Sequence, residues 1–175
     1  MNGDYHDVEQ WLSEGSCDLG FVALPTKQRG RVTALLEDRL LAVVPKDHRL
    51  ASLPRFPIKE VEHEPFISLL ETSDHDARRA LEAAGVTPNI RYTTKDDYAI
   101  IAMVEQGLGV SIMPELLLSG RSDNVRVMEL TPPASRTIGL CLPDADRAGP
   151  ATLRFADCVS DWVREHYSRL QNTLS

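Results

Sequence analysis

The sequence predicts an α/β fold in two lobes, in which buried strands alternate with helices. Residues 93–118 give the main evidence, because a helix that is apolar on every side is followed there by a glycine turn, a short apolar strand and another helical turn. This order is typical of a parallel α/β sheet. Strand and helix alternate again over residues 65–92, and the turn-rich connection 45–57 carries three prolines. We therefore place the first lobe at residues 1–45 and 136–175 and the second at 46–135.

The composition is that of a globular domain. A chain of 175 residues with 42% hydrophobic residues can bury a core. No apolar run is long enough to span a bilayer and the first residues are acidic, so we expect a cytoplasmic protein. The cysteines are odd in number and lack metal-binding spacing, which predicts reduced thiols at Cys17, Cys141 and Cys158. The net charge of -7 argues against binding of the phosphate backbone of a nucleic acid by this chain alone.

The first lobe is expected to open with a helix that Asp4 caps and Gly15 ends. Residues 17–24 have the apolar pattern of a buried parallel strand and stop at a proline. Residues 32–44 form a long extended run with three charged residues inside it, and we expect two strand segments around a turn. After a return strand at residues 136–142, Pro150 opens a long helix. Its inward positions are expected to be Leu153, Ala156, Val159, Trp162, Val163 and Leu170.

In the second lobe we expect a strand at 65–69, a helix that Ser73 and Asp76 begin, and a short strand at 89–92. The next helix is predicted to start with Thr94 as its N-cap and to stop at Gly107. Asp97, three residues after Thr94, is expected to complete a capping box and to place an acidic group at the positive end of the helix dipole. A last strand covers residues 125–128, and the Thr131-Pro132-Pro133 segment is expected to break it.

The motifs that carry chemistry are weak. Gly107 and Gly109 do not form a dinucleotide fingerprint, because that motif needs a strand before the glycines and a helix after them. Ser111 lies in GVSIM rather than in a G-x-S-x-G elbow, so its hydroxyl is expected to face either the core or a cleft. His63 and His75 lack metal-ligand spacing with any third residue. The sequence therefore predicts no catalytic group, no metal site and no cofactor.

A ligand cleft remains as the expected site. In open parallel sheets, ligands bind beyond the carboxyl ends of the strands, and two lobes bring the ends of both sheets to one cleft. Helix N-termini next to these ends favour an anion. Serine and threonine are also common helix caps, so a purely structural role stays open for them. The candidate effector-binding residues are Ala23, Leu24, Pro25, Ser68, Leu69, Thr93, Thr94, Val110, Ser111 and Met113.

Three stretches in order resemble the effector-binding domain of LysR-type transcriptional regulators. The first is WLSEGSCDLGFVALP, which resembles the family's helix, glycine, Asp and apolar strand segment. The second is LLEDRLLAVVPKDHRLA, which is similar to its hinge strand and following turn. The third, D-x-x-I-x-x-M-V-x-x-G-L-G-V-S-I-M-P, resembles the hallmark segment of the family. LTPPASRTIGLCLP and the last helix resemble its return strand and final helix.

The resemblance implies two Rossmann-like lobes of the type 2 periplasmic-binding-protein fold, with an incomplete first lobe. The family's first strand, helix and second strand, and its helix-turn-helix head, have no counterpart in this sequence. We therefore expect a fragment, a product of a misplaced start, or a chain that borrows a partner. The implied function is sensing of a small organic anion by a homodimer or higher homo-oligomer that reaches DNA only through the missing head, without membrane contact. A free-standing solute-binding protein and a small enzyme on the same scaffold remain as alternatives.

Overall fold

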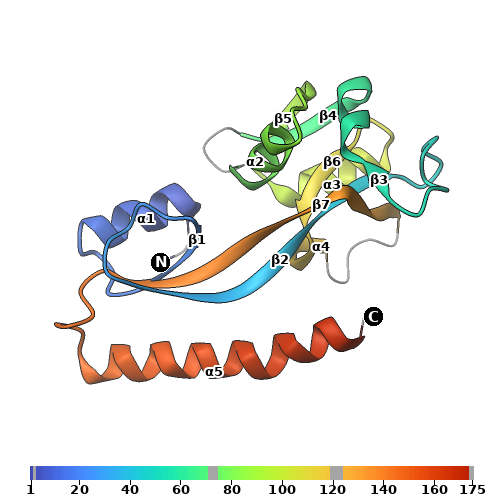
Figure 1. The fold of residues 1–175 in the computed structure, drawn as a ribbon. Helices are drawn as coiled ribbons and strands as arrows, with labels where there is room; N and C mark the ends of the chain where they lie inside the picture. Colours follow the sequence, from blue (N-terminus) through green and yellow to red (C-terminus); the bar gives the residue numbers. More distant parts are fainter. Residues whose placement is uncertain (2, 71–74, 119–123, 174–175) are drawn as a thin grey trace. The chain divides into compact units, whose positions relative to one another are not determined.

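A computed structural model describes residues 1, 3–70, 75–118 and 124–173, and the chain divides into two compact units. Unit 1 comprises residues 1–37 and 137–175, and unit 2 comprises residues 38–136. The chain passes between the units within two long neighbouring strands, β2 (Arg31–Pro45) and β7 (Val125–Leu142) (Figure 1). The first crossing thus lies inside β2, whereas the sequence placed it after residue 45.

Unit 1 contains α1 (Tyr5–Ser13), β1 (Gly20–Leu24) and α5 (Pro150–Thr173). As predicted, Asp4 caps α1, with its carboxylate accepting from the backbone N–H of Asp7 at 2.9 Å. Gly15 follows the helix with a φ of 70°, a left-handed conformation that glycine adopts without strain.

Side chains that alternate along β7 give unit 1 a core on each face of the sheet. Cys141 packs with Leu12 of α1, whereas Leu140 packs with Ala156 of α5. Because neighbouring residues of a strand point to opposite faces, α1 and α5 cover opposite faces (Figure 1).

Two expectations for unit 1 are wrong. β1 is not a buried parallel strand: it pairs antiparallel with β7, from Gly20 opposite Cys141 to Leu24 opposite Thr137, and Phe21 is 46% exposed. The pairing is antiparallel because β7 enters unit 1 from unit 2 in the reverse direction. Trp162 is 50% exposed, because the 3.6-residue helical period turns it away from the side on which Ala156 packs.

Unit 2 combines parallel and antiparallel pairing. β4 and β5 are parallel, Val110 forms a parallel bridge with Phe66, and β6 runs antiparallel to β2. Unit 2 therefore contains both directions of strand pairing, where the sequence predicted a parallel sheet. The elements are β3 (Phe56–Pro57), the 3-10 helix η1 (Ile58–His63), β4 (Pro65–Leu69), α2 (His75–Ala83), β5 (Asn89–Thr94), α3 (Asp97–Glu105), β6 (Ser111–Pro114) and α4 (Glu115–Leu118).

Each of the helices α2 and α3 buries one face, and Tyr98 of α3 is 48% exposed although the sequence of this helix is apolar on every side. Ala77 and Leu81 of α2 are buried in one cluster with Phe66, and Ile100 and Val104 of α3 are buried in a second cluster. The predicted cap Ser73 lies outside the described residues. The capping of α2 by Ser73 therefore stays a prediction.

Both predicted strand breaks are wrong. β2 runs without a turn through its charged residues, and in the extended conformation Asp38 contacts Arg136 and Arg39 contacts Glu115. β7 continues through Pro132 and Pro133, since the fixed φ of proline suits extended backbone.

Candidate functional site

Four of the predicted site residues meet at the carboxyl ends of β4 and β5. In the parallel register Ser68 lies opposite Thr93 and Leu69 lies opposite Thr94. Thr93 is exposed and the other three are half-buried. This edge of unit 2 therefore presents three hydroxyl groups and one leucine side chain on adjacent strand ends.

Backbone hydrogen bonds fix this edge in place. The N–H of Leu70 donates to the carbonyl of Thr94 at 2.9 Å, which continues the pairing one residue beyond β4. The Thr94 hydroxyl accepts from the N–H of Asp96 at 3.1 Å. Asp96, not Thr94, is the N-cap of α3, because its carboxylate accepts from the N–H of Tyr98 at 2.9 Å. Thr94 thus supports the turn before the helix, and the predicted capping role belongs to Asp96.

Ser68 also lines a surface hollow of unit 2. The hollow has a volume of about 330 Å³ and lies beside α2 and β5. Its lining combines apolar side chains with one arginine and one glutamate: Phe66, Ser68, Arg78, Leu81, Glu82, Val86, Thr87, Pro88 and Ile90.

Three further predicted residues lie in the core of unit 2. Val110, Ser111 and Met113 are at most 2% exposed. The sequence left open where the Ser111 hydroxyl points, and it donates to the carbonyl of Ile67 at 2.8 Å. Val110 and Ser111 thus connect the start of β6 to β4, whereas Met113 lies opposite Leu41 of β2.

The remaining predicted residues belong to unit 1. Ala23 and Leu24 end β1, and Pro25 follows it. Ala23 and Leu24 are half-buried and Pro25 is exposed, and Leu24 packs against the cluster of Leu12 and Val22. A role for them in effector contact stays a prediction.

Sequence reasoning missed a charged cluster in unit 2 around Arg136. Its guanidinium lies 2.8 Å from the carboxylate of Asp38 and 3.3 Å from that of Asp76, which also pairs with Arg79. Asp38 accepts in addition from the N–H of Leu116 at 3.1 Å. Burial raises the pKa of Asp38, and the nearby Arg136 only partly offsets this effect. The cluster therefore ties β2, β7 and α2 together through buried charges.

Asp97, the first residue of α3, lies close enough to Arg136 for an electrostatic interaction between the two side chains. One of its carboxylate oxygens is buried, and among the described residues it has no hydrogen-bond donor. Burial raises the pKa of Asp97 despite the opposing effect of Arg136. Asp97 is thus the least well compensated carboxylate near the cluster.

The sequence contains a signal for Asp38. It shares an alternating register with Leu40 and Ala42, whose side chains are buried. A carboxylate at an inward position requires a cationic partner. The neighbouring Arg39 points to the exposed face and contacts Glu115 at 2.6 Å and Glu129 at 2.9 Å.

Within the described ranges, no group of three or more His, Cys, Asp or Glu residues is arranged to hold a metal ion. None of the helices described there is both long and apolar enough to cross a membrane.

Comparison with known proteins identifies the family. The sequence model of the LysR substrate binding domain matches residues 1–164, and the chain belongs to this family. HTH-type transcriptional regulator YvbU of Bacillus subtilis is 27% identical over 161 residues, which cover 91% of this chain and 55% of that protein. Regulator YwbI of the same organism is 32% identical over 130 residues, covering 72% of this chain and 43% of its own length. The chain thus spans about half the length of the curated relatives it matches.

Solved structures show the same fold. The Synechocystis PCC6803 CcmR regulatory domain in complex with 2-PG superposes with a TM-score of 0.82 at 18% identity, covering 93% of this chain and 81% of that one. The effector binding domain of QuiR in complex with shikimate gives a TM-score of 0.80 at 22% identity, covering 94% and 80%. The chain therefore has the periplasmic-binding-protein-like type 2 fold of LysR regulatory domains.

Proposed function

We propose that this chain is the effector-sensing part of a LysR-type transcriptional regulator and that it binds a small organic anion. Membership of the family supports the sensing role. The nature of the ligand is supported by two structural relatives, which are described in complex with 2-PG and with shikimate.

The observation that carries the proposal is the register of β4 and β5, which sets Ser68 beside Thr93 at the sheet edge. An anion at this edge accepts hydrogen bonds from the Thr93 hydroxyl and, in place of the Leu69 carbonyl to which it donates at 3.0 Å, from the Ser68 hydroxyl. Leu69 adds an apolar contact for the body of the ligand. We assign direct contact to Ser68, Leu69, Thr93 and Thr94, and a supporting role to the buried residues of β6.

The action of the whole protein follows from the same proposal. The effector changes transcription by favouring one conformation of a homodimer or higher oligomer, and DNA contact belongs to a helix-turn-helix head outside this chain. The exposed faces of α1 and α2 are the candidate subunit contacts. The protein acts in the cytoplasm without catalysis. Sedimentation that shows only monomer at high concentration would count against this assembly.

Calorimetric titration with aromatic and short aliphatic carboxylates tests the proposed function. We expect saturable binding of at least one acid, and no consumption of that acid when free ligand is followed by chromatography. Consumption of the acid would show that the chain is an enzyme and not a sensor. The absence of binding by any acid, to this chain and to a longer form that includes the helix-turn-helix head, would remove the anion from the proposal.

A further inference from the structure

We propose a second ligand site, in unit 1, that binds a small oxyanion with two or more negative charges. It occupies a surface hollow of about 620 Å³, which is within the usual range for small-molecule sites. All its lining residues belong to unit 1, so it is separate from the edge of β4 and β5. The lining comprises the α1 residues His6, Glu9, Gln10, Leu12 and Ser13, the loop residues Lys27, Gln28 and Arg29, and Pro143.

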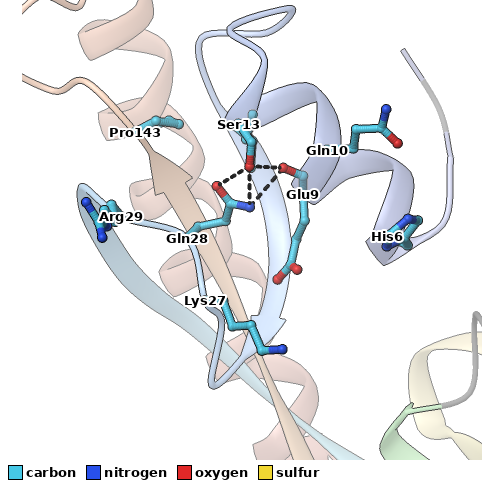
Figure 2. Close-up of a pocket in the computed structure, with 9 residues that line it drawn as sticks. His6, Glu9, Gln10, Ser13, Lys27, Gln28, Arg29 and Pro143 are labelled. Carbon is cyan, nitrogen blue, oxygen red and sulfur yellow. Dashed lines mark hydrogen bonds between the residues drawn. The ribbon is translucent and has the colours of Figure 1, made fainter.

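Hydrogen bonds between the loop and α1 hold the site in shape. The side-chain amide of Gln28 donates to the carbonyl of Glu9 at 2.8 Å and to the hydroxyl of Ser13 at 3.0 Å. The Thr26 hydroxyl donates to the Glu9 carboxylate at 2.6 Å and accepts from the N–H of Gln28 at 3.1 Å. Figure 2 shows Gln28 reaching from the loop to α1. The loop is therefore fixed on the helix.

Gly30 anchors the other end of the loop. Its φ is +104°, and a Cβ atom there would lie 2.3 Å from the carbonyl oxygen of Leu142 and 2.5 Å from that of Pro143. The backbone therefore passes against the end of β7 more closely than any side chain allows. This contact fixes the backbone next to Arg29, which is one of the lining residues.

The charge of the lining favours an anion. All Lys and Arg residues of the first 37 positions lie between Lys27 and Arg31, although the chain as a whole carries -7. Among the described residues, Lys27 and Arg29 form no ion pair, and Glu9 is the one acidic residue of the lining. The lining thus has a net positive charge.

The chemistry of the donors specifies an oxyanion. A guanidinium and an ammonium group recognise phosphate and carboxylate oxygens. The amide of Gln10 uses one N–H on the Glu14 carboxylate at 2.7 Å and has a second as a neutral donor, while Leu12 and Pro143 provide apolar contact for a carbon skeleton. The two cations match the charge of a ligand that carries two negative charges, so the site fits a phosphate-bearing or polycarboxylate metabolite.

The test uses inorganic phosphate and citrate as probes at constant ionic strength, with amide shifts of the ¹⁵N-labelled chain as the readout. We expect saturable shifts of the backbone amides of Gln28 and Arg29 and of the Gln10 side chain. A stronger response to phosphate assigns phosphate-bearing ligands, and a stronger response to citrate assigns polycarboxylates.

Lys27→Ala and Arg31→Ala provide a matched pair of variants. Both residues are exposed and each substitution removes one positive charge from the same segment, but only Lys27 lines the hollow. We expect Lys27→Ala to raise the dissociation constant about threefold to tenfold, and Arg31→Ala to change it less than about twofold. Equal weakening by both variants, or shifts that do not saturate, would overturn the proposal. This outcome is independent of the effector site in unit 2.

Discussion

Asp38 and Arg136, the first and last residues of unit 2, hold each other by a contact of 2.8 Å. Each lies in one of the two strands that cross between the units. Arg136 is only 11% exposed at its side chain and Asp38 only 1%, so this is a buried ion pair. It joins β2 to β7 at the point where both strands enter unit 2.

The first prediction concerns the loss of this arginine. Arg136→Leu leaves the buried carboxylates of Asp38 and Asp76 without their shared cation, and we expect the free energy of unfolding to fall by about 3 kcal/mol or more. Urea denaturation measures the change.

Arg39→Leu is the matched control for this loss. Arg39 also contacts two carboxylates, but its side chain is 46% exposed and the pairs are open to solvent. We expect a change of at most about 1 kcal/mol, which decreases further in high salt. Equal effects of the two substitutions would mean that burial of the Asp38 pair has no energetic consequence.

The second prediction concerns the pH dependence of stability. Because burial raises the pKa of Asp97, the folded state keeps this proton to a higher pH than the unfolded chain does. The stability that this group contributes is therefore present at low pH and is lost as the pH rises from about 4 through the pKa of the folded state. We expect Asp97→Asn to stabilise the protein by about 1 kcal/mol at pH 7.5, with a smaller gain at pH 4.5.

Asp96→Asn is the control for this change. It also converts a carboxylate at the start of α3 to an amide, but asparagine caps helices as well as aspartate does. The stability should change by less than about 0.5 kcal/mol at either pH. A loss of stability in Asp97→Asn at pH 7.5 would show that Asp97 is better compensated by Arg136 than its unpartnered oxygen indicates.

The third prediction separates the two glycines of the turn before β6. A Cβ atom at Gly109 would lie 2.3 Å from the carbonyl oxygen of Pro65, which accepts from the N–H of Val110 at 2.9 Å. Gly109→Ala must displace this carbonyl, and we expect a cost of about 2 to 3 kcal/mol. Gly107 has a φ of +72° with open space around it, so Gly107→Ala should cost only about 1 kcal/mol. Thermal denaturation of both variants measures the two costs. Equal costs would contradict the prediction, because they would show that the backbone at Pro65 moves away from the added Cβ atom without strain.

The sequence predicted correctly those features that depend on interactions between residues close together in the chain. The cap at Asp4 and the stop at Gly107 depend on residues within one helical turn, and both are confirmed. The end of β4 at Leu69 was placed correctly, because strand length and flanking residues limit it, whereas β5 continues two residues beyond its predicted end at residue 92, to Thr94.

The features that the sequence reasoning missed depend on distant partners. Asp38 and Arg136 are separated by 98 positions, so no sequence window contains both. Without Arg136, the charged residues of β2 indicated a turn, and the predicted strand was divided at that point. The antiparallel direction of β1 likewise depends on β7, which lies more than a hundred residues further along the chain. Tertiary pairing thus overrode the local pattern in both cases.

The last prediction concerns the proposed effector contacts. Ser68→Val removes a hydroxyl at the edge of β4, and Thr94→Val removes one at the edge of β5. We expect each to weaken binding of the tightest-binding carboxylate by about 1 to 2 kcal/mol, since a hydrogen bond to a charged group is lost. Thr94→Val should also cost about 0.5 to 1 kcal/mol of stability, because the N–H of Asp96 loses its acceptor.

Calorimetry and urea denaturation of the same preparations separate binding from stability. Ser160→Ala is the control, because its hydroxyl donates to the carbonyl of Ala156 within α5 and lies in unit 1. Its affinity for the carboxylate should equal that of the unchanged chain. Unchanged affinity in both Ser68→Val and Thr94→Val would remove these two residues from the site. Weakening in Thr94→Val alone, in proportion to its loss of stability, would leave the β5 edge with a structural role only.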